Sequence, residues 1–304
     1  MTEPLVECLE QVLARALVTA RCEDEAAWHE VWHQHGLGAE PPIRSALMGG
    51  ALSDRLSWVF ISGYQAALRQ VFPSLPSTGW AAFAATEAKD DPDFPGTALS
   101  PEIAEGGYLL NGHKSWVAQS RHVAHLLVTV RPADLPDAPP SQCVRVDAAA
   151  KGVTLSHRSA PGFLASLSQG FARFEDVHVA GSELLGPKST RAFGRTEPRF
   201  VMLAACGFLL AQMSTANTAH QAPGLLARLT AVSAAIAQAS VDEQVPPEVM
   251  GMLDVAFSEC VDAFDKAGLG ANVTSWAADA RLLRMYSGRI QARAEKARGA
   301  AGSK

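Results

Sequence analysis

Residues 107–117 read Gly-Tyr-Leu-Leu-Asn-Gly-His-Lys-Ser-Trp-Val, and they give the clearest indication of local structure in the chain. A strand-forming run lies on each side of the dipeptide Asn111-Gly112. Asn-Gly between two such runs favours a tight β-hairpin, because both residues accept the positive φ angles of a two-residue turn. The stretch therefore predicts two antiparallel strands that meet at Asn111-Gly112.

Short β-rich segments continue after this hairpin signal. Runs rich in Val, Leu, Phe and Thr predict strands at 124–130, 142–146, 152–157 and 170–174. Residues 132–140 hold four prolines and are expected to form a loop between two of these strands.

Helical spacing of apolar residues is typical of both ends of the chain. It predicts helices at 5–17, 25–35 and 46–71, and again at 199–217, 222–239, 248–267 and 275–297. This order contains no βαβ alternation, which disfavours a doubly wound nucleotide-binding fold. We therefore expect an α+β protein with N-terminal helices (1–77), a middle antiparallel β-domain (78–187) and a C-terminal helical bundle (188–304).

The composition is that of a folded protein with a large core. Of the 304 residues, 48% are hydrophobic and 19% are charged, which leaves too little charge for a disordered or coiled-coil chain. The formal net charge is -5, so no broad electrostatic attraction to nucleic acid is expected.

Cysteine usage and hydropathy predict a cytoplasmic protein. The five cysteines are scattered without a CxxC pair, which indicates reduced and mostly buried thiols. The first residues carry early acids, unlike the basic and apolar start of a signal peptide. The longest apolar run, 200–210, is well short of the ~20 residues that cross a bilayer, so we expect no membrane insertion.

Residues 29–33 read His-Glu-Val-Trp-His and match the HExxH pattern of zinc hydrolases. In that pattern His29 and His33 share one helix face and bind zinc, while Glu30 acts as general base. At the position of the third ligand of the extended pattern stands Ala39. An amphipathic helix that buries its tryptophans explains the same residues. We therefore predict no metal site and keep a zinc hydrolase as a remote alternative.

Several segments, taken in order, resemble the acyl-CoA dehydrogenase family. They are Ala85-Thr86-Glu87 and Leu110-Asn111-Gly112-His113-Lys114-Ser115-Trp116-Val117, then Phe174-Glu175-Asp176-Val177-His178-Val179 with Leu184-Leu185-Gly186, and finally Ala278-Asp279-Ala280-Arg281 with Met285-Tyr286-Ser287-Gly288. Family members carry similar motifs at the flavin domain, at the exit from the β-domain and near the C-terminus. The resemblance implies the same helix, strand and helix order that the hydropathy pattern predicts.

The resemblance also implies a chemistry. In the family, FAD lies in the cleft between the domains, and the reaction is the α,β-dehydrogenation of an acyl thioester. A carboxylate removes the α-proton while a hydride leaves the β-carbon for the flavin. The implied partners are an acyl thioester on CoA or on a carrier protein, and further subunits in a homodimer, a tetramer or a hetero-oligomer with a homologue.

Two positions compete for the catalytic base that the resemblance implies. In the commonest subgroup the base stands where this chain has Ser287, and a serine hydroxyl needs a partner to act as a base. Other members carry the base ten residues before a glycine, at the start of the first long C-terminal helix. Counted back from Gly207, that residue is Glu197. Glu197 and Pro198 are also typical of a plain helix start, so both interpretations stay open here.

The resemblance assigns the flavin to a set of positions that this chain keeps only in part. They are Thr86, Glu87, Trp116, Val117, Ala118, Ser287 and Gly288. Trp116 would lie beside the flavin ring, whereas Ala118 replaces a threonine whose hydroxyl reaches the flavin in the family. Residues 89–93 read Lys-Asp-Asp-Pro-Asp where the family has small residues next to the diphosphate.

The function that these residues favour is a flavin-dependent oxidoreductase of the acyl-CoA dehydrogenase type. Glu197 is its predicted base. The alternative is a subunit that has lost redox activity and acts as the partner of an active homologue.

Overall fold

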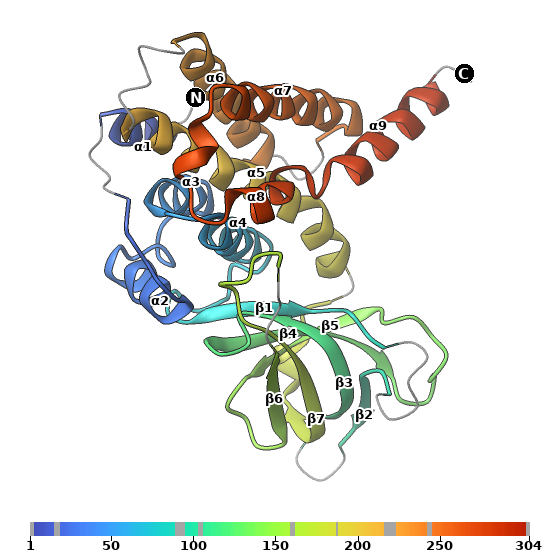
Figure 1. Cartoon of the computed structure of the whole chain (residues 1–304). Helices are drawn as coiled ribbons and strands as arrows, with labels where there is room; N and C mark the ends of the chain where they lie inside the picture. Colours follow the sequence, from blue (N-terminus) through green and yellow to red (C-terminus); the bar gives the residue numbers. More distant parts are fainter. Residues whose placement is uncertain are drawn as a thin grey trace.

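The computed structural model describes residues 3–14, 19–88, 95–102, 106–158, 162–186, 188–215, 223–241 and 245–301. Figure 1 shows helices gathered on one side of a β-domain. The helices are α1 (Glu3–Leu13), α2 (Glu25–Gln34), α3 (Pro42–Leu52), α4 (Leu56–Val71), α5 (Lys188–Thr215), α6 (Pro223–Val241), α7 (Pro247–Lys266), α8 (Trp276–Asp279) and α9 (Ser287–Ala301). Within these described ranges the 3-10 turns are η1 (Gly181–Glu183), η3 (Leu269–Asn272) and η4 (Ala280–Arg284).

The strands form one sheet in the order β1-β4-β2-β3-β7-β6, and β5 also pairs with β4. They are β1 (Trp80–Ala84), β2 (Ala98–Pro101), β3 (Tyr108–Ala118), β4 (Val123–Pro132), β5 (Gln142–Asp147), β6 (Val153–Arg158) and β7 (Gln169–Val179). The expected antiparallel pairing holds for β3 with β7, β7 with β6, β4 with β5 and β2 with β3. In contrast, β1 and the start of β2 lie parallel to β4.

The predicted order of helices, strands and helices is confirmed, and so is the α+β class. The elements change type between α4 and β1 and again between β7 and α5, near the expected boundaries at residues 78 and 188. The two helical parts are not separate bodies, because α3 and α4 both pack on α5 and their side chains share one core. A second core fills the β-domain.

The hairpin predicted at Asn111-Gly112 is wrong, because both residues lie inside the continuous strand β3. The register of β3 with β7 shifts between Leu110 and Gly112, which is a β-bulge. Gly112 has φ +118°, and a side chain there would overlap the backbone of Gly96. Asn111 holds the bulge by accepting from the Asp176 amide at 2.9 Å. The positive φ of Gly112, which suggested a turn, therefore belongs to a β-bulge that bends the single strand β3.

Several helix boundaries differ from the sequence prediction. The helical stretch expected at 46–71 is two helices, α3 and α4, separated at 53–55. The helix expected to start at residue 199 begins already at Lys188, and it contains Pro198 in its interior. The helix expected at 275–297 is divided into α8, η4 and α9. The strands β1 and β2 had no clear signal, since β1 is short and β2 contains a proline.

All five cysteines are free and buried, as expected for reduced thiols. One helix, α6, contains a stretch (224–241) that is long and apolar enough to cross a membrane. However, α6 packs on α5 and α7, and its Leu229 and Ile236 side chains are fully buried. On its exposed side Arg228 forms an ion pair with Glu259 of α7. These are the contacts of a helix in a bundle.

Three glycines allow the backbones of α3 and α4 to pack directly against the backbone of α5. A methyl group on Gly50 of α3 would overlap the Ala204 carbonyl, and one on Gly207 of α5 would overlap the Leu47 carbonyl. On α4, a methyl group on Gly63 would overlap the backbone at Val201. Because these neighbours are backbone atoms, they cannot move aside without shifting a whole helix.

We predict that Gly207→Ala destabilises the protein by ~1–3 kcal/mol in urea unfolding, because the overlap outweighs the higher helix propensity of alanine. The matched control is Gly194→Ala on the same helix, where a methyl group meets no atom within 4 Å. That variant should gain up to ~1 kcal/mol. Equal stability of the two variants would refute the packing argument.

Candidate active site

Glu197 lies in the interior of α5, since this helix begins at Lys188. The interpretation of Glu197-Pro198 as a helix start is therefore wrong, and the helix dipole does not explain the acid. Pro198 has no amide hydrogen, so it leaves the Gly194 carbonyl without its usual partner within the helix. The residues around Glu197 must therefore explain why an acid stands at this position in the helix.

Two tyrosines and one arginine surround the Glu197 carboxyl. Tyr64 comes from α4, Tyr286 lies between η4 and α9, and Arg289 follows on α9. Burial raises the pKa of Glu197 to about 7, although the Tyr286 hydroxyl and the Arg289 charge oppose this shift. The pKa of Tyr286 is raised by burial and by the Glu197 charge. Glu197 is thus a carboxyl whose pKa is close to neutral pH.

The wall around this carboxyl is aromatic. Tyr64 stacks against Phe193 edge to face with ring centroids 5.6 Å apart, and Phe193 packs on Phe83 of β1 at 4.6 Å. The Tyr64 hydroxyl accepts a hydrogen bond of 2.7 Å from the Phe83 amide, which ties α4 to β1. The buried Tyr286 hydroxyl lies close enough to the Glu197 carboxyl to lower its pKa.

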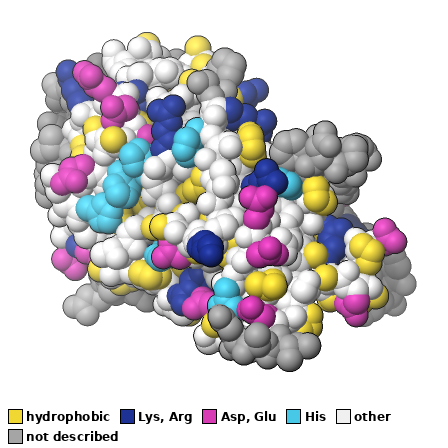
Figure 2. Space-filling view, turned by 90° about the horizontal axis from the view of Figure 1, so that it is seen from below, with side chains coloured by type: hydrophobic (Ala, Val, Ile, Leu, Met, Phe, Trp, Pro, Cys, Tyr) yellow, Lys and Arg dark blue, Asp and Glu magenta, His cyan; other side chains and the backbone are white. Residues whose placement is uncertain are grey.

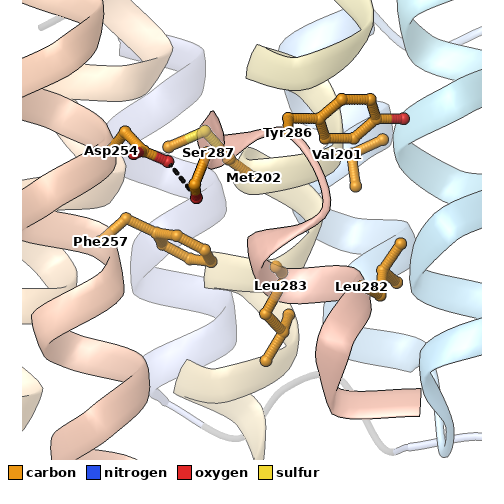
Figure 3. Close-up of a pocket in the computed structure, with 9 residues that line it drawn as sticks. Val201, Met202, Asp254, Phe257, Leu282, Leu283, Tyr286 and Ser287 are labelled. Carbon is orange, nitrogen blue, oxygen red and sulfur yellow. Dashed lines mark hydrogen bonds between the residues drawn. The ribbon is translucent and has the colours of Figure 1, made fainter. Parts of the chain in front are cut away.

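Ser287 occupies the other position that the resemblance assigns to a base. Its hydroxyl donates to Oδ1 of the buried Asp254 at 2.7 Å, and Gln291 donates to Oδ2 of the same carboxylate at 2.7 Å. Figure 3 shows that Ser287 points toward Asp254 of α7, whereas the Tyr286 ring points away from this pair. Ser287 is therefore part of a contact between α7 and α9, on the side away from Tyr286.

The pocket beside Tyr286 and Ser287 is small. It is lined mainly by apolar side chains of α5, α7 and η4, together with Asp254, Tyr286 and Ser287 (Figure 3). About 10 Å³ is open to the centre of a water molecule. That is roughly the room one water requires.

Three of the predicted flavin contacts lie on β3 and differ in exposure. Trp116 is half-buried, and its indole N–H donates to Gln169 at 3.1 Å. Val117 is buried in the core of the β-domain, and Ala118 is buried against the helices. Of these side chains, Trp116 is the one that a ligand can reach.

Thr86 lies beside these residues at the end of β1. Its side chain is exposed, and its carbonyl accepts from the Ser115 amide at 2.9 Å. Arg158 donates to the Ser115 carbonyl at 3.3 Å, so a cation lies at the same edge. Thr86 and Trp116 are thus brought together, whereas Ser287 and the exposed Gly288 belong to the start of α9. Residues 89–93 lie outside the described residues.

The Glu87 carboxylate forms ion pairs inside the β-domain. Its carboxylate pairs with Lys114 at 2.6 Å and with Arg131, and it accepts from the Thr97 amide at 3.1 Å. The Lys114 side chain is fully buried, and burial lowers its pKa to about 8. Lys114 and Arg131 in turn hold the pKa of Glu87 below its usual value, despite its partial burial. The geometry gives the Glu87 side chain a structural role.

The HExxH residues do not form the site of a zinc hydrolase. Across the described ranges, no group of three or more His, Cys, Asp and Glu side chains is placed to hold a metal ion. The Glu30 carboxylate accepts from Gln34 at 3.0 Å on the same helix. The three protein ligands of a catalytic zinc site are therefore not assembled there.

The sequence prediction missed the aromatic partners of Glu197. Tyr286 lies directly before Ser287 in the family-like motif Met285-Tyr286-Ser287-Gly288. That position could have indicated that Tyr286 lies near a site. Tyr64 is one of many large residues on α4 and carries no signal of its own. Arg289 lies one helical turn after Tyr286, with its guanidinium 5.5 Å from the Tyr286 ring centroid.

We predict that Glu87→Gln destabilises the protein by ~3–5 kcal/mol, because it leaves the buried Lys114 charge without its counter-ion. The control is Glu175→Gln, which removes an exposed pair with Arg173 and should change stability by less than ~1 kcal/mol. Urea unfolding at pH 7 measures both. A Glu87 variant as stable as the control would argue against the structural role.

We also predict a pH-dependent gain in stability for Glu197→Gln. The ordinary pKa of Glu is 4.5, and the folded protein raises it to about 7, so ionisation of Glu197 destabilises the wild type as pH rises through this window. The variant should match the wild type near pH 4 and exceed it by on the order of 2–3 kcal/mol at pH 8. Thermal unfolding across this range measures the difference. Parallel stability curves for the wild type and Glu197→Gln would contradict the apolar setting of this carboxyl.

No protein-family model and no curated protein matches the sequence, whereas many solved structures match its fold. One is described as PigA with FAD and proline, with 14% identity, a TM-score of 0.60 and coverage of 96% of this chain and 98% of that one. The prolyl acyl carrier protein oxidase AnaB has 12% identity, a TM-score of 0.65 and coverage of 96% and 99%. Butyryl-CoA dehydrogenase from Megasphaera elsdenii has 14% identity, a TM-score of 0.64 and coverage of 98% of both chains.

Proposed function

We propose that this chain, which has the fold of the acyl-CoA dehydrogenases, is an FAD-dependent oxidoreductase that removes hydrogen from the α- and β-carbons of an acyl thioester. The observation that carries the proposal is the Glu197 carboxyl, whose pKa is raised to about 7 between two buried tyrosines. A general base works best when its pKa is near the working pH. Glu197 meets that condition without a metal or a histidine.

In the proposed reaction Glu197 takes the α-proton of the thioester. A carboxylate in an apolar wall is a stronger base than one in water, because burial disfavours its charge. The Tyr286 hydroxyl and the Arg289 guanidinium oppose this effect, and so keep part of the carboxyl ionised at neutral pH. The aromatic wall of Tyr64, Phe193 and Phe83 would exclude water from the proton transfer.

FAD, when bound, supplies the two-electron acceptor that the hydride from the β-carbon requires. Thr86 and Trp116 are the residues that would hold the flavin. The exposed Thr86 lies next to the strand that carries Trp116, which supports the fit. Arg158, at the same edge, offers a cation for a diphosphate. Ala118 supplies no hydroxyl, so a flavin would have one hydrogen bond fewer here than the family resemblance implies.

The thioester substrate would be bound to CoA or to a carrier protein. Two of the structures with a similar fold are a butyryl-CoA dehydrogenase and a prolyl acyl carrier protein oxidase. Both fit a carboxylate base that acts on the carbon next to a thioester. We propose this substrate class and leave the acyl chain open.

A subunit without redox activity is the second candidate, and specific observations favour it. The Glu87 carboxylate is already occupied by Lys114 and Arg131, and the described pocket beside Tyr286 has room for about one water. Such a subunit would act beside an active homologue. It would keep the fold and lose the flavin.

We also propose a cytoplasmic protein that associates through its helices into a homodimer or tetramer, or with a homologue. The free thiols support a reducing compartment. The Met252 and Val255 side chains on the outer face of α7 are 64% and 49% exposed, which supports a protein contact there.

We predict that the purified chain, reconstituted with FAD, absorbs near ~450 nm and is bleached by an acyl thioester without oxygen. Bleaching should accelerate as pH rises through about 7, because Glu197 must be ionised to accept the proton. Glu197→Gln should slow it by ~100-fold or more. Stopped-flow absorbance measures the rate.

The matched control is Glu30→Gln, which should bleach at the wild-type rate, because Glu30 is an exposed residue of α2 that is bonded to Gln34. A chain that stays colourless after reconstitution would support the redox-inactive subunit. Rapid bleaching of a flavin-loaded Glu197→Gln variant would show that another group is the base.

A further inference from the structure

We propose that His29 and His33 form a binding site for a divalent transition-metal ion, separate from the Glu197 site. Both residues lie on α2, four positions apart, and therefore on the same face of the helix. Their Nε2 atoms are 3.1 Å apart, and both side chains are half-buried. The proposal is independent of the flavin chemistry.

The distance between the two nitrogens suits a shared cation. With metal–nitrogen bonds of about 2.0–2.1 Å, atoms 3.1 Å apart subtend roughly 100° at the metal. This angle lies between the roughly 90° of octahedral or square-planar sites and the roughly 109° of tetrahedral sites. The distance between the two Nε2 atoms is therefore compatible with chelation of one metal ion.

The surroundings fix the two rings before any ion binds. His29 packs edge to face on Trp80 of β1 with centroids 4.5 Å apart, and His122 stacks on its ring at 5.4 Å. On the other side His33 packs edge to face on Trp32 at 5.2 Å. Figure 2 shows histidine side chains grouped at the surface on one face of the molecule. An ion bound here would reach solvent and complete its coordination with water.

The contact between the two rings requires a neutral imidazole, because one of the two Nε2 atoms must accept a hydrogen bond. Neutral imidazole is the form that binds metal. Without an ion, one Nε2–H must donate to the other nitrogen, and a metal would replace this shared hydrogen.

The ligand set defines which cations fit. Imidazole suits Cu²⁺, Ni²⁺ and Zn²⁺, whereas Mg²⁺ and Ca²⁺ need oxygen ligands. With the same two nitrogens, Cu²⁺ should bind most tightly, as first-row divalent ions generally do with nitrogen ligands. The Glu30 carboxylate is bonded to Gln34, so the site binds metal without the hydrolytic machinery of HExxH enzymes.

The test is calorimetric titration of the full, untagged chain with Cu²⁺, Ni²⁺, Zn²⁺ and Mg²⁺ at pH 7.5. We expect one equivalent of each transition metal to bind, with Cu²⁺ tightest, and no heat of binding from Mg²⁺. Cu²⁺ should also quench tryptophan emission, because Trp80 and Trp32 contact the two ligands. His29→Gln and His33→Ala should each weaken binding by ~10-fold or more, since even outer-shell changes cost that much.

His35→Ala is the matched control, because His35 is exposed at the end of the same helix and should leave binding unchanged. His33→Ala keeps the test decisive if loss of the His29–Trp80 contact unfolds the other variant. Circular dichroism checks the fold of each protein. The proposal is overturned if no metal binds stoichiometrically, if folded His33→Ala binds as the wild type does, or if His35→Ala abolishes binding.

Discussion

The backbone contacts between α3, α4 and α5 determine where the candidate site can form. Gly63 of α4 packs directly on the backbone at Val201, one helical turn after Glu197. Tyr64 follows Gly63, so the contact that brings the two helices together also places the tyrosine against the carboxyl. Any side chain at Gly63 would separate the helices and move Tyr64 away from Glu197. Helix packing and acid–base chemistry therefore depend on the same atoms.

The sequence pattern predicted element types well where the chain is strongly periodic. The two helical regions and four of the strands were found, because burial on one face sets their hydrophobic spacing. It failed at Asn111-Gly112, because local chemistry specifies a positive φ but not whether the chain turns or bulges there. Pairing of β3 along its length with β7 decided the outcome. That contact joins residues far apart in the sequence, so no local rule contains it.

The candidate site was predicted in part. Glu197 was found by its spacing to Gly207, but its environment could not be inferred, since Tyr64 and Tyr286 reach it from distant elements. Glu87 illustrates the opposite case. Its place in a flavin motif suggested a cofactor contact, whereas its carboxylate neutralises Lys114 and Arg131 within the β-domain. A residue in a family motif can thus be required by the fold rather than by a ligand.

Pro198 gives α5 two mechanically different parts. Beyond the proline, the helix is fixed along its length by glycine contacts with α3 and α4. Before it, the missing hydrogen bond to the Gly194 carbonyl lowers the resistance of the helix to bending. Glu197 sits at this joint, and Phe193 lies one turn earlier on the less constrained part. A small change in the angle of that segment would move Phe193, and with it the aromatic wall, relative to the Glu197 carboxyl.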